Sequence, residues 1–466
     1  MSDSSLEDRG PRIGFDLGTL TLDLPQKAVE ALALPFMVWD PRAELFRAHG
    51  YYYRELIRYF YKSQKPYQDQ AAQYNRLEIK LQSPHAPRDY QKDAQTAWNR
   101  SKRGVCALPT GSGKSFLAQM IIADLGRSAL VLAPTIDLVL QWQANLAESF
   151  GVPVGMLGGG SHEILDITVS TYDSARLYAE QLGPRFCLLI FDECHHLPAP
   201  GMAEMAKSFI APYRLGLTAT PPIDPEKQAL LTDLTGPLVY QQQISQLSGL
   251  HLAPYRVETI EVELNPDERE LYEHYRGVYL QFREGFSLLF RGNQPWSRFV
   301  LHAFKSKEGR EALNAFRVQK DLAIGALAKF EALEELLLKH RGSRILIFTN
   351  DNKTAYRISS LFILPLITHE TKAKERREVL ANFRGGRWPV LVNSRVLNEG
   401  VDVPEAEVAI IVSGTATVRE HVQRLGRILR KSAGKEAVLY ELVTSDTTEI
   451  YASRKRRDHQ AYAPFG

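Results

Sequence analysis

The most constraining feature of this sequence is the run LPTGSGKS, from Leu108 to Ser115. It follows the apolar run GVCA and precedes a segment of helical character, FLAQMIIADL. Glycines at a strand-to-helix junction let backbone N–H groups approach an anion, and the helix N-terminus adds a favourable dipole. Leu108 stands where many such loops carry glycine, but the GSGKS core and its setting disfavour a simple turn. The run therefore predicts a phosphate-binding loop.

The side chains of this loop predict its chemistry. Lys114 can reach the β- and γ-phosphates of a nucleotide as a point charge, and the Ser115 hydroxyl is placed to ligate Mg²⁺. ATP and Mg²⁺ are therefore the expected cofactors. The residues expected to surround the nucleotide are Pro109, Thr110, Gly111, Ser112, Gly113, Lys114 and Ser115.

A second cluster, Asp192, Glu193, Cys194 and His195, follows the apolar run CLLIF. The carboxyl end of a parallel strand is where open α/β sheets place ligands. We expect Asp192 to hold Mg²⁺ and Glu193 to orient and deprotonate the attacking water. Taken alone, the letters DECHH fit a metal cluster or a solvated strand end equally well. Downstream of a phosphate loop, they predict a hydrolytic centre.

Short β-rich runs alternate with helical patterns over residues 88–240 and again over 323–443, which predicts two α/β units with parallel sheets. The second unit lacks a phosphate loop. It contains Gln423, Arg427 and Arg430, whose spacings of four and three place them on one helix face. Such a face is commonly solvated charge, but arginines that meet a γ-phosphate raise transfer rates by about 10³–10⁵-fold. We expect these residues to be catalytic, so that closure of the two units completes the site.

An N-terminal region precedes the first unit. Residues 1–86 mix apolar alternation with the aromatic segment HGYYYRELIRYFYKSQKPY and end at the Pro-containing turn SPHAP. They carry 11 Lys+Arg against 11 Asp+Glu, so charge does not indicate what they do.

An insertion separates the two units. Residues 271–320 carry 9 Lys+Arg against 4 Asp+Glu, a surplus of five positive charges. Helical spacing of its aromatic residues favours the buried face of a helix over a base-stacking surface. Those residues are Tyr272, Tyr275, Tyr279, Phe282, Phe286 and Phe290. Better candidates for contact with the phosphates of a nucleic acid, with solvated charge equally open, are Arg276, Arg283, Arg291 and Arg298.

Composition restricts the classes that remain. The net charge of +3 and isoelectric point near 8.5 are too low to mark a nucleic-acid binder, so such binding must depend on local patches. Cys106, Cys187 and Cys194 lack the spacing of a disulfide framework or a zinc site. The start MSDSSLEDRG does not fit a secretory signal, and no apolar run has membrane-spanning length. We therefore expect a cytoplasmic protein without a membrane partner.

Taken in order, the motifs over roughly residues 88–442 resemble those of superfamily 2 helicases. Arg88 and Gln91 in RDYQ look like the adenine-reading motif, with Gln91 as the base contact. Thr218 and Thr220 in TAT look like the motif that couples hydrolysis to strand movement, and His195 would link it to the hydrolytic centre.

Other segments resemble motifs that hold a nucleic-acid strand or couple the second lobe to the nucleotide. In the first unit, three segments look like those that hold the phosphates of a strand. They are Pro134 and Thr135, the later pair QW at Gln141 and Trp142, and ST with Thr171. In the second unit, two segments resemble the coupling motif. The first contains Ser394 and Arg395, which we expect at the nucleic acid, and the second contains Gly400 and Asp402, which we expect at the nucleotide.

Within that superfamily the likeness is greatest to the XPB group, in its short archaeal and bacterial form. LPTGSGKS, RDYQKDAQTAW, DECHH and the N-terminal FMVWDPRAELFRAHGYYY all fit that group. The resemblance implies two RecA-like lobes in an α/β fold and an ATP-dependent 3′-to-5′ DNA helicase or double-strand translocase of repair or transcription. It also implies forked or damaged duplex DNA, a nuclease or repair protein as partner, and a place on the nucleoid.

The expected domains combine these patterns with the resemblance. They are a small α+β accessory module resembling a damage-recognition domain (1–86), the first RecA-like lobe with the ATP site (87–254), a helical, thumb-like insertion (255–322), the second RecA-like lobe (323–445) and a basic C-terminal tail (446–466).

Three other functions remain open at this stage. An RNA helicase would use the same lobes, and competition between DNA and RNA as activators of ATP hydrolysis would separate it. A translocating subunit of a restriction system has a similar engine but should carry nuclease or docking domains. An ATP-gated clamp that recruits a nuclease would hold DNA without unwinding it.

Overall fold

The computed structural model describes residues 10–24, 34–83, 86–242, 255–285, 295–394, 406–413 and 437–457. Two compact units make up the chain, and the main division between them falls after Gln243. None of the helices within the described ranges is both long and apolar enough to cross a membrane.

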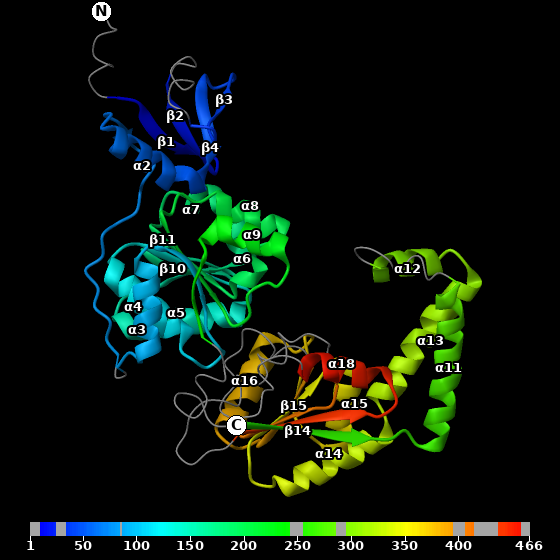
Figure 1. Cartoon of the computed structure of the whole chain (residues 1–466). Coiled ribbons are helices and arrows are strands. Elements are labelled where there is room, and N and C mark those ends of the chain that lie inside the picture. The colour runs from blue at the N-terminus through cyan, green and yellow to red at the C-terminus, as the bar shows by residue number, and fades with distance from the viewer. Residues whose placement is uncertain are drawn as a thin grey trace, which may run out of the picture. The chain divides into compact units, whose positions relative to one another are not determined.

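The N-terminal module is a small sheet with helix α2 packed against it (Figure 1). Its elements are β1 (Arg12–Asp16), β2 (Thr19–Asp23), β3 (Val38–Asp40), β4 (Leu45–His49), the 3₁₀ helix η1 (Gly50–Tyr52), α2 (Tyr53–Ser63) and β5 (Gln68–Asp69). The sheet has the order β3-β4-β2-β1-β5, with antiparallel pairing up to β1 and β5 parallel to β1. Leu20 and Leu22 alternate with partly exposed threonines in β2 and face Leu56 and Phe60 of α2 in one core. The predicted α+β module is confirmed.

The module is docked on the first lobe through a built interface. Ile210 of the lobe is fully buried in the core of the module. Glu55 of α2 pairs with Arg103 of the lobe at 3.1 Å. The guanidinium of Arg214, fully buried, donates to the backbone oxygens of residues 209, 211 and 234 and lies 5.9 Å from the ring centre of Tyr51. The module and the first lobe therefore form one packed body.

The segment after β5 is bound along the first lobe. Its backbone N–H groups donate to lobe carbonyls, from Gln73 to Pro184 at 2.9 Å, Leu77 to Gly126 at 2.9 Å and Gln82 to Ser149 at 2.7 Å. Ala71 and Tyr74 still pack on the core of the module, whereas the backbone from Gln73 to Gln82 is hydrogen-bonded to the lobe. The module therefore passes into the surface of the lobe before the boundary predicted at residue 86.

The first lobe is a mainly parallel sheet with helices on both faces (Figure 1). Its strands are β6 (Arg103–Ala107), β7 (Ala129–Ala133), β8 (Gly155–Gly158), β9 (Ser161–His162), β10 (Ile167–Thr171), β11 (Leu188–Asp192), β12 (Tyr213–Thr218) and β13 (Leu238–Gln241). Its helices are α3 (Asp89–Asn99), α4 (Lys114–Leu125), α5 (Ile136–Phe150), α6 (Tyr172–Leu177), α7 (Ala179–Leu182), the 3₁₀ helix η2 (Cys194–His196), α8 (Pro200–Lys207) and α9 (Pro225–Thr235). The sheet order is β13-β6-β12-β11-β7-β10-β8-β9, and β9 joins antiparallel.

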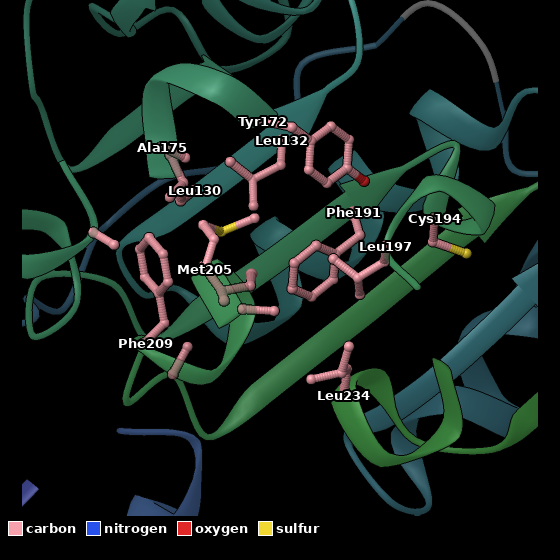
Figure 2. Close-up of a cluster of buried hydrophobic side chains, with 14 of the residues drawn as sticks. Leu130, Leu132, Tyr172, Ala175, Phe191, Cys194, Leu197, Met205, Phe209 and Leu234 are labelled. Carbon is pink, nitrogen blue, oxygen red and sulfur yellow. The ribbon is translucent and has the colours of Figure 1, made fainter. Parts of the chain in front are cut away.

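The central strands are buried on both faces, as expected for a parallel sheet between two helical layers. Every residue of β7 (ALVLA) and β11 (LLIFD) is buried. Figure 2 shows one of the cores that result, in which Leu132 and Phe191 of the strands meet Tyr172 of α6 and Met205 of α8. The cysteines Cys106, Cys187 and Cys194 are free and buried.

The second unit holds another parallel sheet, in the order β14-β19-β18-β15-β17-β16. Its strands are β14 (Tyr255–Val262), β15 (Ile345–Thr349), β16 (Leu366–Ile367), β17 (Val390–Ser394), β18 (Val408–Ile411) and β19 (Ala437–Thr444). Its helices are α11 (Pro266–Glu284), α12 (Pro295–Ala303), α13 (Lys307–Ile324), α14 (Leu327–Lys339), α15 (Asn352–Phe362), α16 (Ala373–Arg384) and α18 (Thr448–Arg457). The predicted α/β class with two parallel-sheet lobes is confirmed.

The predicted start of the helical insertion, at residue 255, is wrong. Tyr255–Val262 forms β14, which pairs in parallel with β19 along its whole length. The segment YRVETIEV is rich in β-branched residues, which fit a pleated strand better than a helix. The insertion therefore consists of α11, α12 and α13, and the sheet of the second lobe begins before it.

The aromatic stripe of the insertion is mainly core, as predicted. Tyr272 and Tyr279 of α11 are buried, and Tyr275 and Phe282 pack against the cluster of Phe299, Ala303 and Leu313. Phe286, Phe290 and Arg291 lie outside the described residues.

Two of the arginines proposed for DNA contact stack on the stripe itself. Arg276 lies 5.9 Å from the ring centre of Tyr272 and donates to its hydroxyl at 3.2 Å, and Arg283 lies 5.8 Å from the ring centre of Tyr279. Arg298 is exposed. The rings of Tyr272 and Tyr279 thus help to position the guanidinium groups of Arg276 and Arg283.

The basic C-terminal tail predicted over 446–466 is wrong for its first part. Thr448–Arg457 forms α18, in which Ser453 is buried and donates to Glu441 of β19 at 2.9 Å. Glu449 of the same helix accepts from Lys329 of α14 at 2.6 Å. Lys329 is fully buried and also donates to the Val412 carbonyl at 2.8 Å. These contacts make α18 part of the second lobe.

We expect Lys329→Met to destabilise the second lobe by about 3 kcal/mol, because breaking a buried pair leaves the Glu449 carboxylate without its cation. A loss of this size lowers the thermal midpoint of that lobe by roughly 6–12 °C, measurable by calorimetry on the full chain. Lys353→Met is the control, since Lys353 pairs with Asp321 on the surface with its own side chain 82% exposed. Equal effects of the two substitutions would contradict a structural role for the buried pair.

Candidate active site

Residues predicted to be functional in the first lobe lie at the carboxyl ends of its parallel strands. β6 leads into the phosphate loop, β7 ends before Pro134 and Thr135, β10 ends at Thr171, β11 at Asp192 and β12 at Thr218. These strands are neighbours in the order β6-β12-β11-β7-β10, so their ends share one edge of the sheet. This is the edge at which open α/β sheets bind ligands.

The loop after β6 has the backbone geometry of a phosphate site. Gly111 and Gly113 have φ angles of +81° and +86°, which favour glycine, and a Cβ atom on Gly113 would lie 2.5 Å from Nε2 of Gln91. Lys114 is the first residue of α4, and its Nζ donates to the Leu108 carbonyl at 3.3 Å. The Thr110 hydroxyl is buried and has no hydrogen-bond partner among the described residues. This donor and the N–H groups at the start of α4 fit a bound phosphate chain.

The predicted adenine-reading motif is tied to the loop. Gln91 is 3% exposed, and its amide nitrogen donates to the carbonyls of Ser112 at 3.1 Å and Gly113 at 3.3 Å. Its amide oxygen accepts from the Arg88 N–H at 3.0 Å, and the Tyr90 hydroxyl donates to the Ser112 carbonyl. Gln91 therefore holds the loop in this structure, and base contact by its amide stays a prediction.

The acidic pair lies beside the loop at the end of β11. Asp192 is buried and its Oδ1 accepts from the Glu193 N–H at 3.0 Å, while its Oδ2 accepts from Nε1 of Trp142 at 2.8 Å. Burial and the neighbouring Glu193 raise the pKa of the Asp192 carboxyl, against the opposing influence of Trp142 and Lys114. A cation at this carboxylate would relieve the desolvation of its charge, so the donor set suits Mg²⁺.

A chain of contacts leads from Glu193 to the predicted coupling motif. Oε2 of Glu193 is buried, accepts no hydrogen bond within the described part of the chain, and lies 3.4 Å from Nδ1 of His195. The same His195 nitrogen lies 3.1 Å from the Thr218 hydroxyl oxygen, which accepts from the Thr220 N–H at 3.1 Å. The structure thus brings together the residues expected to couple hydrolysis to movement.

The metal-cluster explanation of DECHH gains no support. In the described ranges, no three or more His, Cys, Asp or Glu side chains are grouped so as to hold a metal ion. His195 instead contacts Thr218, and Cys194 is buried in the hydrophobic core.

The predicted strand-holding residues begin two helices. The Thr135 hydroxyl caps α5 by accepting from the Leu138 N–H at 3.4 Å. The Thr171 hydroxyl caps α6 by accepting from the Ser174 N–H at 3.1 Å. Both hydroxyls therefore fix the direction in which a helix leaves the sheet edge.

Of the site residues predicted in the second lobe, Ser394 is among the described residues. Ser394 ends β17, is 2% exposed, and donates to Oδ1 of Asn352 at 2.7 Å. Its hydroxyl is therefore engaged inside the lobe. The other predicted residues of this lobe lie outside the described residues: Arg395, Gly400, Asp402, Gln423, Arg427 and Arg430.

Two aromatic residues at the acidic pair were not predicted there. Trp142 was assigned to strand holding, but its side chain binds Asp192, and the Tyr172 hydroxyl donates to the Asp192 carbonyl at 2.8 Å. Val139, Trp142, Leu146 and Phe150 are the buried residues of α5, and their spacing of three and four is the signal that would have placed Trp142 inside.

Comparison with known proteins follows the same division of the chain. Residues 13–71 match the xeroderma pigmentosum group B helicase damage recognition domain, 84–223 the type III restriction enzyme res subunit, and 310–463 the ERCC3/RAD25/XPB C-terminal helicase. The protein named DNA 3′-5′ translocase XPB2 of Sulfurisphaera tokodaii is 39% identical over 424 residues, which cover 91% of this chain and 96% of that protein. The chain belongs to the XPB family of superfamily 2 helicases.

Other members of the XPB family are more distant and longer. The DNA 3′-5′ helicase XPB of Mycobacterium tuberculosis is 28% identical over 79% of this chain and 63% of its own length. The general transcription and DNA repair factor IIH helicase/translocase subunit XPB/SSL2 of Saccharomyces cerevisiae is 26% identical over 82% of this chain and 44% of its own length. Membership of the XPB family confirms the prediction of an ATP-dependent helicase.

A solved structure supports the fold of this XPB-family chain. The helicase domain of Hef from Pyrococcus furiosus superposes with a TM-score of 0.51 at 20% identity and covers 80% of this chain and 98% of that one. The match to the restriction subunit is confined to the first lobe, and the segments on both sides match XPB-type domains. This pattern does not favour a restriction translocase.

Proposed function

We propose that the chain is an ATP-dependent DNA translocase and helicase of 3′-to-5′ polarity that acts in DNA repair, with transcription as a further setting. The observation that carries the proposal is the shared sheet edge of the first lobe, where phosphate loop, acidic pair, coupling threonines and strand-holding threonines are neighbours. The names of the XPB relatives, which specify DNA and this polarity, support it.

In this proposal the first lobe binds and activates ATP with its own residues. Lys114 and the Thr110 hydroxyl hold the phosphate chain, and Ser115 and Asp192 hold Mg²⁺, which when bound neutralises charge on the phosphate oxygens. Glu193 orients a water and accepts its proton through the carboxylate oxygen that makes no hydrogen bond within the described residues. His195 and Thr218 carry the change at Glu193 to β12.

The remaining site residues complete the proposal for the second lobe. Gln423, Arg427 and Arg430 would meet the γ-phosphate, and Gly400 and Asp402 would lie at the nucleotide, as the family resemblance implies. Ser394 and Arg395 would act at the nucleic acid, alongside Pro134, Thr135 and Thr171. Arg88 and Gln91 would recognise the base.

The proposed substrate and partners of the chain involve the N-terminal module and the insertion. The N-terminal module, a match to a damage recognition domain, would engage forked or damaged duplex DNA, and α11–α13 would form the thumb-like element. A nuclease or other repair protein as partner and a place on the nucleoid are predictions from the family resemblance.

The proposal predicts that DNA stimulates ATP hydrolysis by the full chain more strongly than RNA of the same sequence. Phosphates of either polymer supply charge, but the strand-holding motifs transmit binding to catalysis only when the correct strand is engaged. Steady-state hydrolysis with forked DNA, duplex DNA and RNA measures this preference. Stronger activation by RNA would favour the RNA helicase instead.

A parallel assay separates a motor from a clamp. Strand displacement and footprinting on forks of either polarity should show 3′-to-5′ displacement that depends on ATP. Protection of the fork without displacement would favour the ATP-gated clamp and overturn the helicase proposal.

A further inference from the structure

Both helices that begin at predicted strand-holding threonines reach the same acidic residue. Thr135 caps helix α5, and two turns later Trp142 donates from its indole nitrogen to Oδ2 of Asp192 at 2.8 Å. Thr171 caps helix α6, and the first residue of that helix, Tyr172, donates from its hydroxyl to the backbone carbonyl of Asp192 at 2.8 Å. The two donors come from different helices and meet one residue.

Packing alone does not explain the contact that Trp142 makes. Trp142 is 2% exposed and lies on the apolar face of α5, so burial accounts for its ring, but its buried N–H selects a carboxylate as acceptor. Trp98, which is also buried, donates instead to the backbone carbonyl of Arg214 at 3.0 Å. The lobe thus contains two buried tryptophans with the same kind of donor and different kinds of acceptor.

Hydrogen bonds to both of its oxygens leave the Asp192 carboxylate little freedom to turn. Its Oδ1 is held by the Glu193 N–H at 3.0 Å and its Oδ2 by Trp142, while Tyr172 holds the backbone of the same residue. A shift of α5 or α6 at their first turns therefore moves a hydrogen-bond donor at Asp192.

We infer that Trp142 and Tyr172 are positioning residues that set the orientation of Asp192 according to whether a nucleic-acid strand is held at the first turns of α5 and α6. This inference rests on the proposed function, since it assumes that Asp192 holds Mg²⁺ and that the threonine motifs hold a strand. It adds a physical route by which strand binding stimulates hydrolysis. The route includes the hydrogen bond between Trp142 and Asp192, two residues that are 50 positions apart in the sequence.

The test compares Trp142→Phe with Trp98→Phe in the full chain. Each substitution removes one indole donor from a buried site of the same lobe and retains an aromatic ring. Two quantities are measured: the Mg²⁺ concentration that half-saturates binding of a fluorescent ADP analogue, and the ratio of hydrolysis rates with and without DNA. Partners that orient metal ligands change metal affinity or activity by about 10–100-fold when removed.

We expect Trp142→Phe to raise the half-saturating Mg²⁺ concentration by about 10-fold or more and to lower the DNA stimulation ratio, with nucleotide binding in the absence of Mg²⁺ unchanged. Trp98→Phe should change neither quantity. Equal changes in both variants would overturn the inference, because they would report a loss of packing. A weakened Mg²⁺ response with an unchanged DNA ratio would also overturn it, since no signal from the strand would then pass through Trp142.

Tyr172→Phe provides a second variant that removes one oxygen atom and retains the ring in its core. It should lower the DNA stimulation ratio, and an unchanged ratio would overturn the part of the inference that concerns α6. Failure of the proposed function can be distinguished from failure of this inference. If DNA does not stimulate hydrolysis by the unmodified chain, the proposed function fails, and the Mg²⁺ titration still decides whether Trp142 orients Asp192.

Discussion

Glu193→Gln is expected to slow ATP hydrolysis by about 10²–10⁴-fold, the usual contribution of a positioned general base. Gln keeps the size of the side chain but cannot accept the proton of the attacking water. The buried Oε2 of Glu193 makes no hydrogen bond within the described ranges, so the substitution breaks none there. Binding of a fluorescent ATP analogue should therefore remain close to that of the unmodified chain. Single-turnover hydrolysis combined with a binding titration measures both quantities.

The control for this substitution is Glu204→Gln. Glu204 is a surface residue of α8 that pairs with Lys207 at 2.8 Å with its own side chain 63% exposed, so its replacement should leave hydrolysis unchanged. Full hydrolysis by the Glu193 variant would exclude that residue as the base. Loss of nucleotide binding together with hydrolysis would instead indicate that Glu193 supports the shape of the site.

Lys114→Ala is expected to reduce hydrolysis by about 10²–10³-fold, the cost of removing one donor aimed at charge that develops in a transition state. Unlike the Glu193 variant, it should also weaken binding of the triphosphate more than that of the nucleoside, because Lys114 lies at the start of α4 where the phosphates would bind. Titrations with ATP, ADP and adenosine separate these contributions.

Lys92→Ala is the matched control, since Lys92 is exposed on α3 and pairs with Asp89 at 3.2 Å. It should leave both hydrolysis and nucleotide binding unaltered. An unchanged rate in the Lys114 variant would contradict the assignment of the loop and, with it, the motor.

The fold was predictable where the information is local. The phosphate loop needs a strand before it and a helix after it, and β6 and α4 supply both within a few residues. The buried strands β7 and β11 are apolar throughout, which identifies them without any knowledge of their neighbours. The position of β14 could not be obtained in this way, because its partner β19 begins at Ala437, and only their pairing assigns β14 to the second lobe.

The candidate site shows the same limit. The identities of Lys114, Asp192 and Glu193 follow from residue types at fixed spacings, but the contacts that orient them join distant segments. Nothing in the letters QW predicts that Trp142 reaches Asp192, and the motif around Gln91 does not reveal that its amide is bound to the loop. These contacts depend on how neighbouring strands are ordered in the sheet, which the local sequence does not specify.

The docking of the N-terminal module has a practical consequence for dissecting this helicase. A chain started at residue 87 would uncover Ile210 and the Arg214 guanidinium, which the module now shields from water. It would also lack the segment after β5, whose backbone from Gln73 to Gln82 is hydrogen-bonded to the lobe. Such a truncation would mainly measure the loss of stability of the first lobe, so single substitutions on the outer face of the module are the cleaner way to test what the module itself contributes.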